Sequence, residues 1–257
     1  MYVDTHAHLF LDHFKTDIKA VLDSCSDHDV HRIYLPNIDT STIDAVHELS
    51  DRFPDRCFPQ MGLHPCSVKA DYKEQLEVLY QQFKYRKYAA VGEMGIDLYW
   101  DKTYVNEQVE AFKIQVEWAR DMELPLVIHS RDSLDMTIEL ITELQKGDLT
   151  GIFHCFNGTI DQAKKIEDVG FMMGMGGVIT FKNSGMTEVV SEINMDMLVL
   201  ETDAPYLTPT PHRGKRNLSS YIPIIAEKLA EIKRCSLEKV AEVTTNNANK
   251  IYNYTPL

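Results

Sequence analysis

The fold is decided by a unit that begins with Pro-Leu-Val-Ile-His-Ser-Arg-Asp, residues 125–132. Its first half is a short apolar run that ends on His129, as a buried β-strand would. Residues 133–145, which follow, have the apolar spacing and composition of a helix. The unit is therefore a strand followed by a helix, with a polar side chain placed where the strand ends.

The same alternation of apolar runs and amphipathic segments recurs along the whole chain. In the predicted helix 107–121, Val109, Phe112, Val116 and Ala119 fall on one face. Further helices are predicted at 221–233 and 237–251, the last with Ser236 as its N-cap. Eight strands are predicted, at 2–8, 32–37, 57–64, 88–93, 125–129, 151–155, 171–176 and 197–203.

These units together predict a (β/α)₈ barrel. Eight units in 257 residues leave about 32 residues for each, which is what a strand, a helix and their loops need. The strands are apolar throughout, as parallel strands covered on both faces should be. A doubly wound open sheet is the alternative. Because no linker or repeat divides the chain, we predict a single domain over 1–257.

The composition limits the function. The formal net charge is −13, from 39 acidic and 26 basic residues, which argues against a protein that coats nucleic acid by bulk charge but leaves room for a local phosphate site. The longest apolar segment, 171–181, is shorter than the about 20 residues that a spanning helix needs. The polar Asp4, His6 and His8 interrupt the start of the chain, so no signal peptide is expected.

The cysteines predict free thiols. There are five, an odd number, and none forms a Cys-x-x-Cys pair. A disulfide framework and a cysteine zinc site are both disfavoured, and a cytoplasmic location is expected.

Histidines and carboxylates gather at the ends of the predicted strands. In a barrel these ends share one mouth, where catalytic groups concentrate. His6 and His8 are two residues apart, so a strand would point both to the same face. The whole set is larger than one tetrahedral ion needs and suits two ions that share a carboxylate. Its members are His6, His8, Glu93, His129, His154 and Asp203, and His64 also lies at a strand end. Four further histidines, His13, His28, His31 and His47, are expected on the surface.

With these residues in order, the sequence resembles the TatD family of metal-dependent deoxyribonucleases, which are amidohydrolase-type barrels. The resemblance spans essentially the whole chain. The matching segments are Asp-Thr-His-Ala-His-Leu (4–9), Gly-Leu-His-Pro (62–65), Val-Gly-Glu-Met-Gly-Ile-Asp (91–97), Pro-Leu-Val-Ile-His-Ser-Arg-Asp (125–132), His-Cys-Phe (154–156) and Glu-Thr-Asp-Ala-Pro-Tyr-Leu (201–207). Phe10 departs from the pattern, since the family usually has Asp or Asn there, and this affects a contact near the ligands.

The resemblance implies two divalent metal ions. Glu93 would bridge them, in the place that many amidohydrolases give to a carbamylated lysine. The first ion would be held by His6, His8, Glu93 and Asp203, and the second by Glu93, His129 and His154. Zinc, manganese and magnesium stay open as the identity of the metal.

Two loops indicate a phosphate substrate. In barrels the loops after strands 7 and 8 often form a phosphate site. Here the first of these loops, 174–183, is glycine-rich, and the second, 209–217, is basic and matches the family's Pro-His-Arg-Gly-Lys segment. We therefore expect Arg213 and Lys215, with Arg216 beside them, to neutralise phosphate oxygens.

The expected mechanism is attack of a metal-activated hydroxide on phosphorus. We expect Asp203 to orient this nucleophile and to accept its proton. His64 would contact phosphate or protonate the leaving oxygen. Glu201 is interpreted as an auxiliary acid or a buried ion-pair partner. Either Arg131 or Asp132 would orient the preceding histidine ligand, while Asp132 as a helix N-cap is the alternative.

The function predicted from these features is a divalent-metal-dependent deoxyribonuclease that hydrolyses DNA phosphodiester bonds, as a 3′-5′ exonuclease on single strands or ends. DNA would be held through few phosphate contacts, with no membrane and no obligate protein partner. The alternative is a metal-dependent deacylase or amidohydrolase on the same scaffold, such as a D-aminoacyl-tRNA deacylase. A non-catalytic metal-binding barrel is disfavoured by the complete ligand set.

Overall fold

The computed structural model describes residues 1–253, so the last four residues of the predicted domain 1–257 lie outside the described residues. All eight predicted strands are present. They are β1 (Tyr2–Asp4), β2 (Val30–Pro36), β3 (Cys57–Gln60), β4 (Val91–Asp97), β5 (Leu126–Arg131), β6 (Gly151–Phe153), β7 (Met172–Met175) and β8 (Leu198–Leu200). The helices are α1 (Ile18–Asp27), α2 (Ile43–Arg52), α3 (Tyr72–Gln82), α4 (Val105–Met122), α5 (Leu134–Leu144), α6 (Ile160–Asp168), α7 (Met186–Glu192), α8 (Ile222–Lys233) and α9 (Leu237–Ile251).

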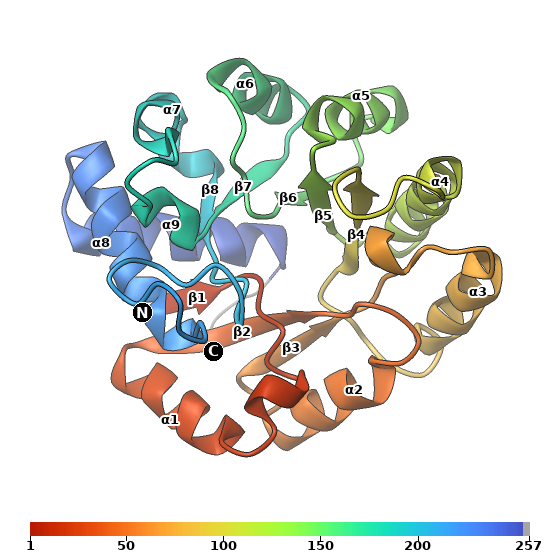
Figure 1. The fold of residues 1–257 in the computed structure, drawn as a ribbon, viewed down its shortest axis with the longest axis horizontal. Helices are drawn as coiled ribbons and strands as arrows, with labels where there is room; N and C mark the ends of the chain where they lie inside the picture. Colours follow the sequence, from red (N-terminus) through yellow and green to blue (C-terminus); the bar gives the residue numbers. More distant parts are fainter. Residues whose placement is uncertain (254–257) are drawn as a thin grey trace.

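The strands run parallel and follow one another around a ring in chain order (Figure 1). Strands β1 to β3 form one sheet and β4 to β8 form the other. Single parallel bridges join the two sheets, from Met61 to Val91 on one side and from Ala7 to Ala204 on the other. Helices α1 to α8 surround the ring in Figure 1. The barrel prediction is therefore confirmed, and the doubly wound open sheet is wrong.

The predicted strand boundaries differ from the observed ones most at β4. The prediction ended this strand at Glu93, but β4 continues to Asp97 because residues 94–97 pair with Ile128–Arg131 of β5. Gly95 makes this close pairing possible, since a Cβ there would lie 2.0 Å from the carbonyl oxygen of His129. Most of the other strands are shorter than predicted.

The predicted helices agree with the structure. Helix α4 buries Phe112, Val116 and Ala119 on its predicted apolar face. Ser236 caps α9, accepting a hydrogen bond from the Lys239 backbone N–H through its side chain. No described helix is both long and apolar enough to cross a membrane.

Helix α9 closes the barrel at the end opposite the mouth. A small apolar cluster links strand side chains such as Val3 and Val199 with Ala248 and Ile251 of α9. The Asn247 amide donates hydrogen bonds to the carbonyl oxygens of Leu198 (2.8 Å) and Met195 (2.9 Å). Helix α9 thus covers the end of the barrel at which the strands begin, so a functional site is expected at the opposite end, where the strands finish.

Candidate metal centre

The seam between β1 and β8 positions the first group of side chains. Ala7 lies in the bridge to Ala204, and His6 and His8 flank it, so both imidazoles point away from the Ala7 side chain and into the mouth. The Asp203 backbone N–H donates to the His6 carbonyl oxygen at 2.9 Å. The Nε2 atoms of His6 and His8 are 3.3 Å apart and lie 3.8 and 3.5 Å from Asp203 Oδ1.

Glu93 lies between two groups of imidazoles and offers one oxygen to each. Its Oε2 is 3.2 Å from His6 Nε2 and 3.4 Å from His8 Nε2. Its Oε1 is 3.0 Å from His129 Nδ1 and 2.9 Å from His154 Nε2. A carboxylate with this division of its two oxygens can bridge two cations, and the structure brings together all six residues for which the sequence predicted metal ligation.

Asp97 orients His129, a role that sequence reasoning missed. Asp97 Oδ2 is 3.0 Å from His129 Nε2, so the proton of a neutral imidazole sits there and the lone pair on Nδ1 faces Glu93. The expectation that Arg131 or Asp132 would do this is wrong. The guanidinium of Arg131 lies instead 3.9 Å above the Tyr99 ring.

The alternative role for Asp132 is also wrong. The N-cap of α5 is Ser133, whereas Asp132 precedes the cap and is exposed. The Asp97 role had a signal in the sequence: it lies four residues after Glu93, an even number, so one strand puts both side chains on the same face.

Glu201 supports the turn that carries His154. Its carboxylate is buried, accepts the Cys155 backbone N–H at 2.6 Å and lies 3.6 Å from His154 Nδ1. A Cβ on Gly174 would come within 2.0 Å of Glu201 Oε2, so this glycine leaves the space that the carboxylate fills. Glu201 is thus placed behind a ligand, away from any substrate.

His64 joins the cluster with a different tautomer. Its Nδ1 accepts the Cys66 backbone N–H at 3.1 Å, so a neutral His64 carries its proton on Nε2, which lies 3.3 Å from Glu93 Oε1. A protonated nitrogen cannot ligate a metal ion. His64 is therefore set up as a hydrogen-bond donor at the mouth.

The electrostatics of the cluster keep its carboxylates ionised. Burial alone would raise the pKa of Glu93, but the imidazoles of His154, His64 and His6 hold it well below its usual range. Burial likewise opposes ionisation of Asp203, yet its hydrogen bond with His8 and the nearby His6 keep its pKa lowered.

His154 shows the opposite effect. Burial alone would lower its pKa, but the carboxylates of Glu93 and Glu201 raise the pKa well above the usual value. The free site therefore attracts protons at a position where a cation can replace them.

The donor set fits divalent cations. Among the residues that the structure describes, the groups of three side chains whose ligand atoms lie within 4.8 Å of one another are His6 with His8 and Asp203, His6 with Glu93 and His154, and His64 with Glu93 and His129, the last of which is open to a cation only if the proton leaves His64 Nε2. Glu93 Oε2 is buried without a hydrogen-bond partner in this part of the chain and faces two imidazole nitrogens. A cation at that point would satisfy all three atoms, and two ions are accommodated on the two sides of Glu93.

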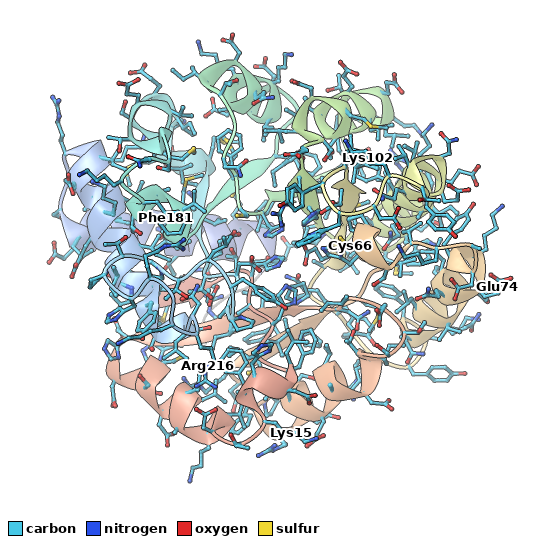
Figure 2. The ribbon with its side chains drawn as sticks, in the orientation of Figure 1. Lys15, Cys66, Glu74, Lys102, Phe181 and Arg216 are labelled. Atoms are coloured by element: carbon cyan, nitrogen blue, oxygen red, sulfur yellow. The ribbon has the colours of Figure 1, made fainter. Side chains whose placement is uncertain are left out.

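Of the residues predicted to contact phosphate, His64 lines the cleft of the cluster, whereas the basic residues of the loop after β8 do not. Arg213 lies over the Phe181 ring at 3.8 Å and bonds the Thr208 carbonyl oxygen. Arg216 pairs with Asp17 at 2.6 Å, and Figure 2 shows it beside α1, away from the cleft residue Cys66. The residues that line the cleft are His8, Ile38, His64, Cys66, Glu93, Asp97, Trp100, His129, Arg131, His154, Asp203, Tyr206 and Leu207.

Arg131 is the basic residue that lines the cleft. It is exposed, and no carboxylate among the described residues lies within 4.0 Å of its guanidinium nitrogens. Arg131 is therefore the candidate for the predicted cationic contact with phosphate, although the sequence suggested another role for it. Lys215 is exposed in the loop after β8, outside the cleft lining.

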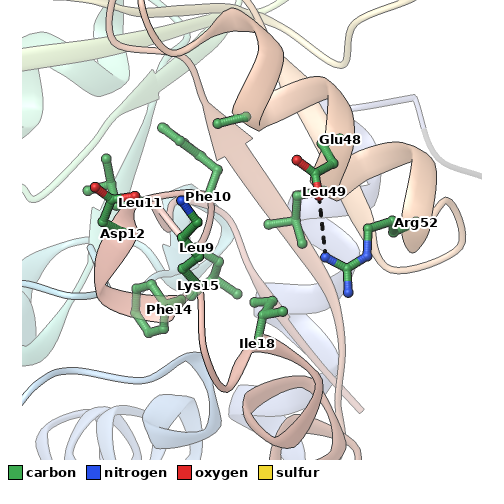
Figure 3. A pocket seen from close by; sticks show the side chains of 11 residues that line it. Leu9, Phe10, Leu11, Asp12, Phe14, Lys15, Ile18, Glu48, Leu49 and Arg52 are labelled. Carbon is green, nitrogen blue, oxygen red and sulfur yellow. Dashed lines mark ion pairs between the residues drawn. The ribbon is translucent and has the colours of Figure 1, made fainter.

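Phe10 makes an apolar contact at the position where the sequence departs from its family pattern. Its ring meets the His8 ring edge-on, with centroids 5.7 Å apart, and His8 Nδ1 has no partner within the described chain. Phe10 also lines a separate hollow between the loop after β1 and helix α2 (Figure 3). That hollow contains no residue of the metal cluster.

The four histidines predicted on the surface and the cysteines follow their predictions with one difference. His13, His28 and His31 are exposed, whereas His47 is half-buried and bonds the Tyr88 hydroxyl at 2.7 Å. The cysteines in the described residues are all free thiols.

The sequence comparisons agree over nearly the whole chain. A family model described as TatD related DNase matches residues 3–253. The uncharacterized metal-dependent hydrolase YabD of Bacillus subtilis is 36% identical over 253 residues, covering 98% of this chain and 99% of its own length. The uncharacterized metal-dependent hydrolase YcfH of Escherichia coli is 32% identical over 192 residues, 74% of this chain and 72% of its own.

The structural comparisons agree with them. The crystal structure of YjjV, a TatD homologue from Escherichia coli, matches with a TM-score of 0.93 at 27% identity, over 99% of this chain and 98% of its own. A TatD family hydrolase from Entamoeba histolytica matches with a TM-score of 0.83 at 21% identity, over 99% of this chain and 98% of its own, which supports the fold alone.

Proposed function

The chain belongs to the TatD related DNase family and is a metal-dependent hydrolase, and from this premise we propose that it hydrolyses DNA phosphodiester bonds, removing nucleotides from the 3′ end of an unpaired strand. The observation that carries the proposal is that Arg131 lines the same cleft as Glu93 and that His64 Nε2 lies 3.3 Å from Glu93 Oε1. A metal-binding cluster with two hydrogen-bond donors in the same cleft suits a substrate with several anionic oxygens.

The chemistry at the cluster follows from its charges. Divalent ions bound there would lower the pKa of a water molecule and neutralise phosphate oxygens. Asp203 is ionised, lines the cleft and faces both His6 and His8, so it is our candidate to accept the proton of the attacking water. Glu93 holds the two halves of the cluster together and is not available as a base.

The leaving oxygen needs stabilisation from the other side of the cluster. His64 carries its proton on Nε2 at the mouth, where it can donate a hydrogen bond to the leaving oxygen, and the proton that Asp203 takes from the water is available to complete the 3′-hydroxyl. Water adds across the bond between phosphorus and the 3′ oxygen, so a nucleoside 5′-phosphate is released and the shortened strand keeps a 3′-hydroxyl. Arg131 would hold a non-bridging oxygen during this step.

The test is direct hydrolysis of end-labelled single-stranded DNA by the purified protein with Zn²⁺, Mn²⁺ or Mg²⁺. We expect stepwise shortening of the 5′-labelled strand and release of mononucleotides. Glu93→Gln should abolish the reaction, because an amide cannot bridge two cations with equal anionic oxygens. Tyr85→Ala, an exposed change outside the cleft lining, should leave it intact.

D-aminoacyl-tRNA forms the second arm of the same test. Deacylation without shortening of either labelled DNA strand, under every metal, would overturn the nuclease proposal in favour of the acyl-transfer alternative. Endonucleolytic fragments in place of mononucleotides would overturn the 3′-end proposal alone.

A further inference from the structure

Exposed aromatic side chains stand around the mouth of the cleft. Trp100 is 68% exposed and Tyr206 is 49% exposed, and both line the cleft together with the metal cluster. Tyr99, next to Trp100, is 51% exposed. Scattered apolar residues on a surface need no explanation, but two exposed aromatic rings that line the cleft of the metal cluster do.

The two cleft-lining rings come from opposite sides of the barrel. Trp100 follows β4 and Tyr206 follows β8, and these strands are four positions apart in a ring of eight. The Tyr206 ring lies 6.2 Å from the His8 ring, and the Trp100 ring lies 5.3 Å from the Arg131 guanidinium. A strand crossing the mouth would therefore pass one ring on each side of the cluster.

The backbone segments that carry the two rings are held by hydrogen bonds, most of them to residues of the cluster. The backbone N–H groups of Tyr99 and Trp100 donate to Asp97 Oδ1 at 2.9 and 3.0 Å. The Tyr206 backbone N–H donates to the Asp203 carbonyl oxygen at 2.8 Å, and the Asn217 amide donates to the Tyr206 carbonyl oxygen at 2.6 Å. The segments that carry the rings are thus fixed relative to the cluster, which lowers the cost of ordering on binding.

The negative charge of the chain favours uncharged contacts with an anionic substrate. The net charge is −13, and the predicted basic loop after β8 is partly engaged elsewhere, with Arg216 bound to Asp17. Phosphate contacts away from the metal ions are therefore few. Base stacking on aromatic side chains supplies affinity for single strands without any positive charge and without sequence preference.

We propose that Trp100 and Tyr206 stack on the nucleobases on either side of the scissile phosphate, so that the site takes unpaired DNA strands and excludes paired ends. Paired bases cannot splay apart to meet rings on two sides of the mouth. The proposal rests on the proposed function for the identity of the reaction, but it concerns binding and is tested without turnover.

The test uses the metal-loaded protein and an oligonucleotide of about 10 nucleotides with 2-aminopurine at its 3′ end, joined through a non-hydrolysable phosphonate linkage so that no strand is cut. Stacking quenches 2-aminopurine fluorescence, so we expect quenching on binding to the wild type. Trp100→Ala and Tyr206→Ala should each weaken binding about 5- to 150-fold, the range for one stacked base. Trp100→Phe should restore most of the loss.

Three controls make the outcome specific. Tyr85→Ala removes an aromatic ring that is 84% exposed but lies between α3 and β4, at the other end of the barrel, and it should change nothing. An oligonucleotide with abasic 3′ sites should bind the wild type and Trp100→Ala equally. The salt dependence should be shallow, because each phosphate contact to a single strand adds only about 0.7 to the slope of log K against log salt.

The two proposals fail separately. Trp100-dependent quenching without hydrolysis of DNA would leave the stacking surface in place and refute the nuclease. Hydrolysis of DNA with no quenching, with unchanged binding in both alanine variants, or with duplex ends bound as tightly as single strands, would refute the stacking surface and leave the nuclease.

Discussion

Asp97→Asn should convert His129 from a ligand into a non-ligand. In the wild type, Asp97 Oδ1 accepts two backbone N–H groups, from Tyr99 and Trp100, while Oδ2 faces His129 Nε2 at 3.0 Å. Asparagine has one oxygen and one NH₂ group. If the oxygen keeps the two backbone bonds, the NH₂ donates to His129 Nε2 and forces the imidazole proton onto Nδ1, which then has no lone pair for a cation.

The other amide orientation is no better. With its oxygen toward His129, the NH₂ would face two backbone donors and leave both without an acceptor. The lost bond involves a charged acceptor, worth ~1.5–3 kcal/mol. Changes to groups that orient a metal-binding histidine typically cost about 10- to 100-fold in metal affinity, or ~1.4–2.8 kcal/mol, so the two estimates agree.

The assay is calorimetric titration of the metal-free protein with Zn²⁺ and Mn²⁺. We expect one of the two equivalents, the one on the His129 side of Glu93, to weaken about 10- to 100-fold while the other keeps its affinity. NMR of the imidazole nitrogens should show the His129 proton moving from Nε2 to Nδ1. Asp132→Asn is the matched control, since this exposed carboxylate is close in sequence but has no part in the geometry.

One result would refute the reasoning: both equivalents binding Asp97→Asn as tightly as the wild type, with the His129 proton unmoved. Loss of both equivalents together with a lowered Tm would instead indicate general unfolding around the buried carboxylate. Thermal melting followed by circular dichroism separates that outcome from the local one.

Three further changes test the structure around the site. Gly174→Ala should lower the free energy of unfolding in urea by ~1–3 kcal/mol, because the added Cβ would lie 2.0 Å from Glu201 Oε2. Gly176→Ala is the control and should be tolerated, because the nearest atoms to its Cβ are 3.7 Å away and its φ is −107°. Equal effects of the two changes would contradict the packing argument. Burial lowers the pKa of His47, so as the pH falls the unfolded chain binds a proton on this imidazole before the folded chain does. The free energy of unfolding should therefore fall as the pH drops below about 6.5, and less steeply in His47→Gln. Equal slopes of stability against pH in the wild type and the variant would remove His47 as the cause. Burial raises the pKa of the Cys57 thiol to about 12, so thiol reagents should reach it at pH 8 only after unfolding, and rapid labelling of the native protein would be inconsistent with that.

The sequence predicted the ligands better than their supports, for a physical reason. His6, Glu93 and His154 could be found because each lies at or near the end of an apolar run, and topology alone brings strand ends together. Asp97 was missed because the strand was ended at Glu93. The even spacing from Glu93 would indicate a shared face only in a longer strand, and that extension depends on pairing with β5, for which Gly95 leaves the space.

The basic loop after β8 failed as a predictor for a different reason. The sequence shows a cluster of cations but not where the loop folds. Its path depends on contacts with distant parts of the chain: Arg216 bonds to Asp17, 199 residues away, and Arg213 stacks on Phe181. Arg131, by contrast, sits at the end of a strand and is held over Tyr99, so its place follows from the barrel itself.

These placements change how an acidic chain could hold an acidic substrate. If the basic loop carried phosphate binding, affinity would depend steeply on salt and extend to long duplexes. With Arg131 as the basic side chain in the cleft, metal ions bound at Glu93 would balance the charge of the scissile phosphate. The neighbouring nucleotides would bind through the uncharged rings of Trp100 and Tyr206. The repulsion from a net charge of −13 then favours release of the shortened strand after each cut. We therefore expect hydrolysis that is distributive, with the enzyme leaving the strand between cuts, and a chase with unlabelled strand should stop shortening within one step.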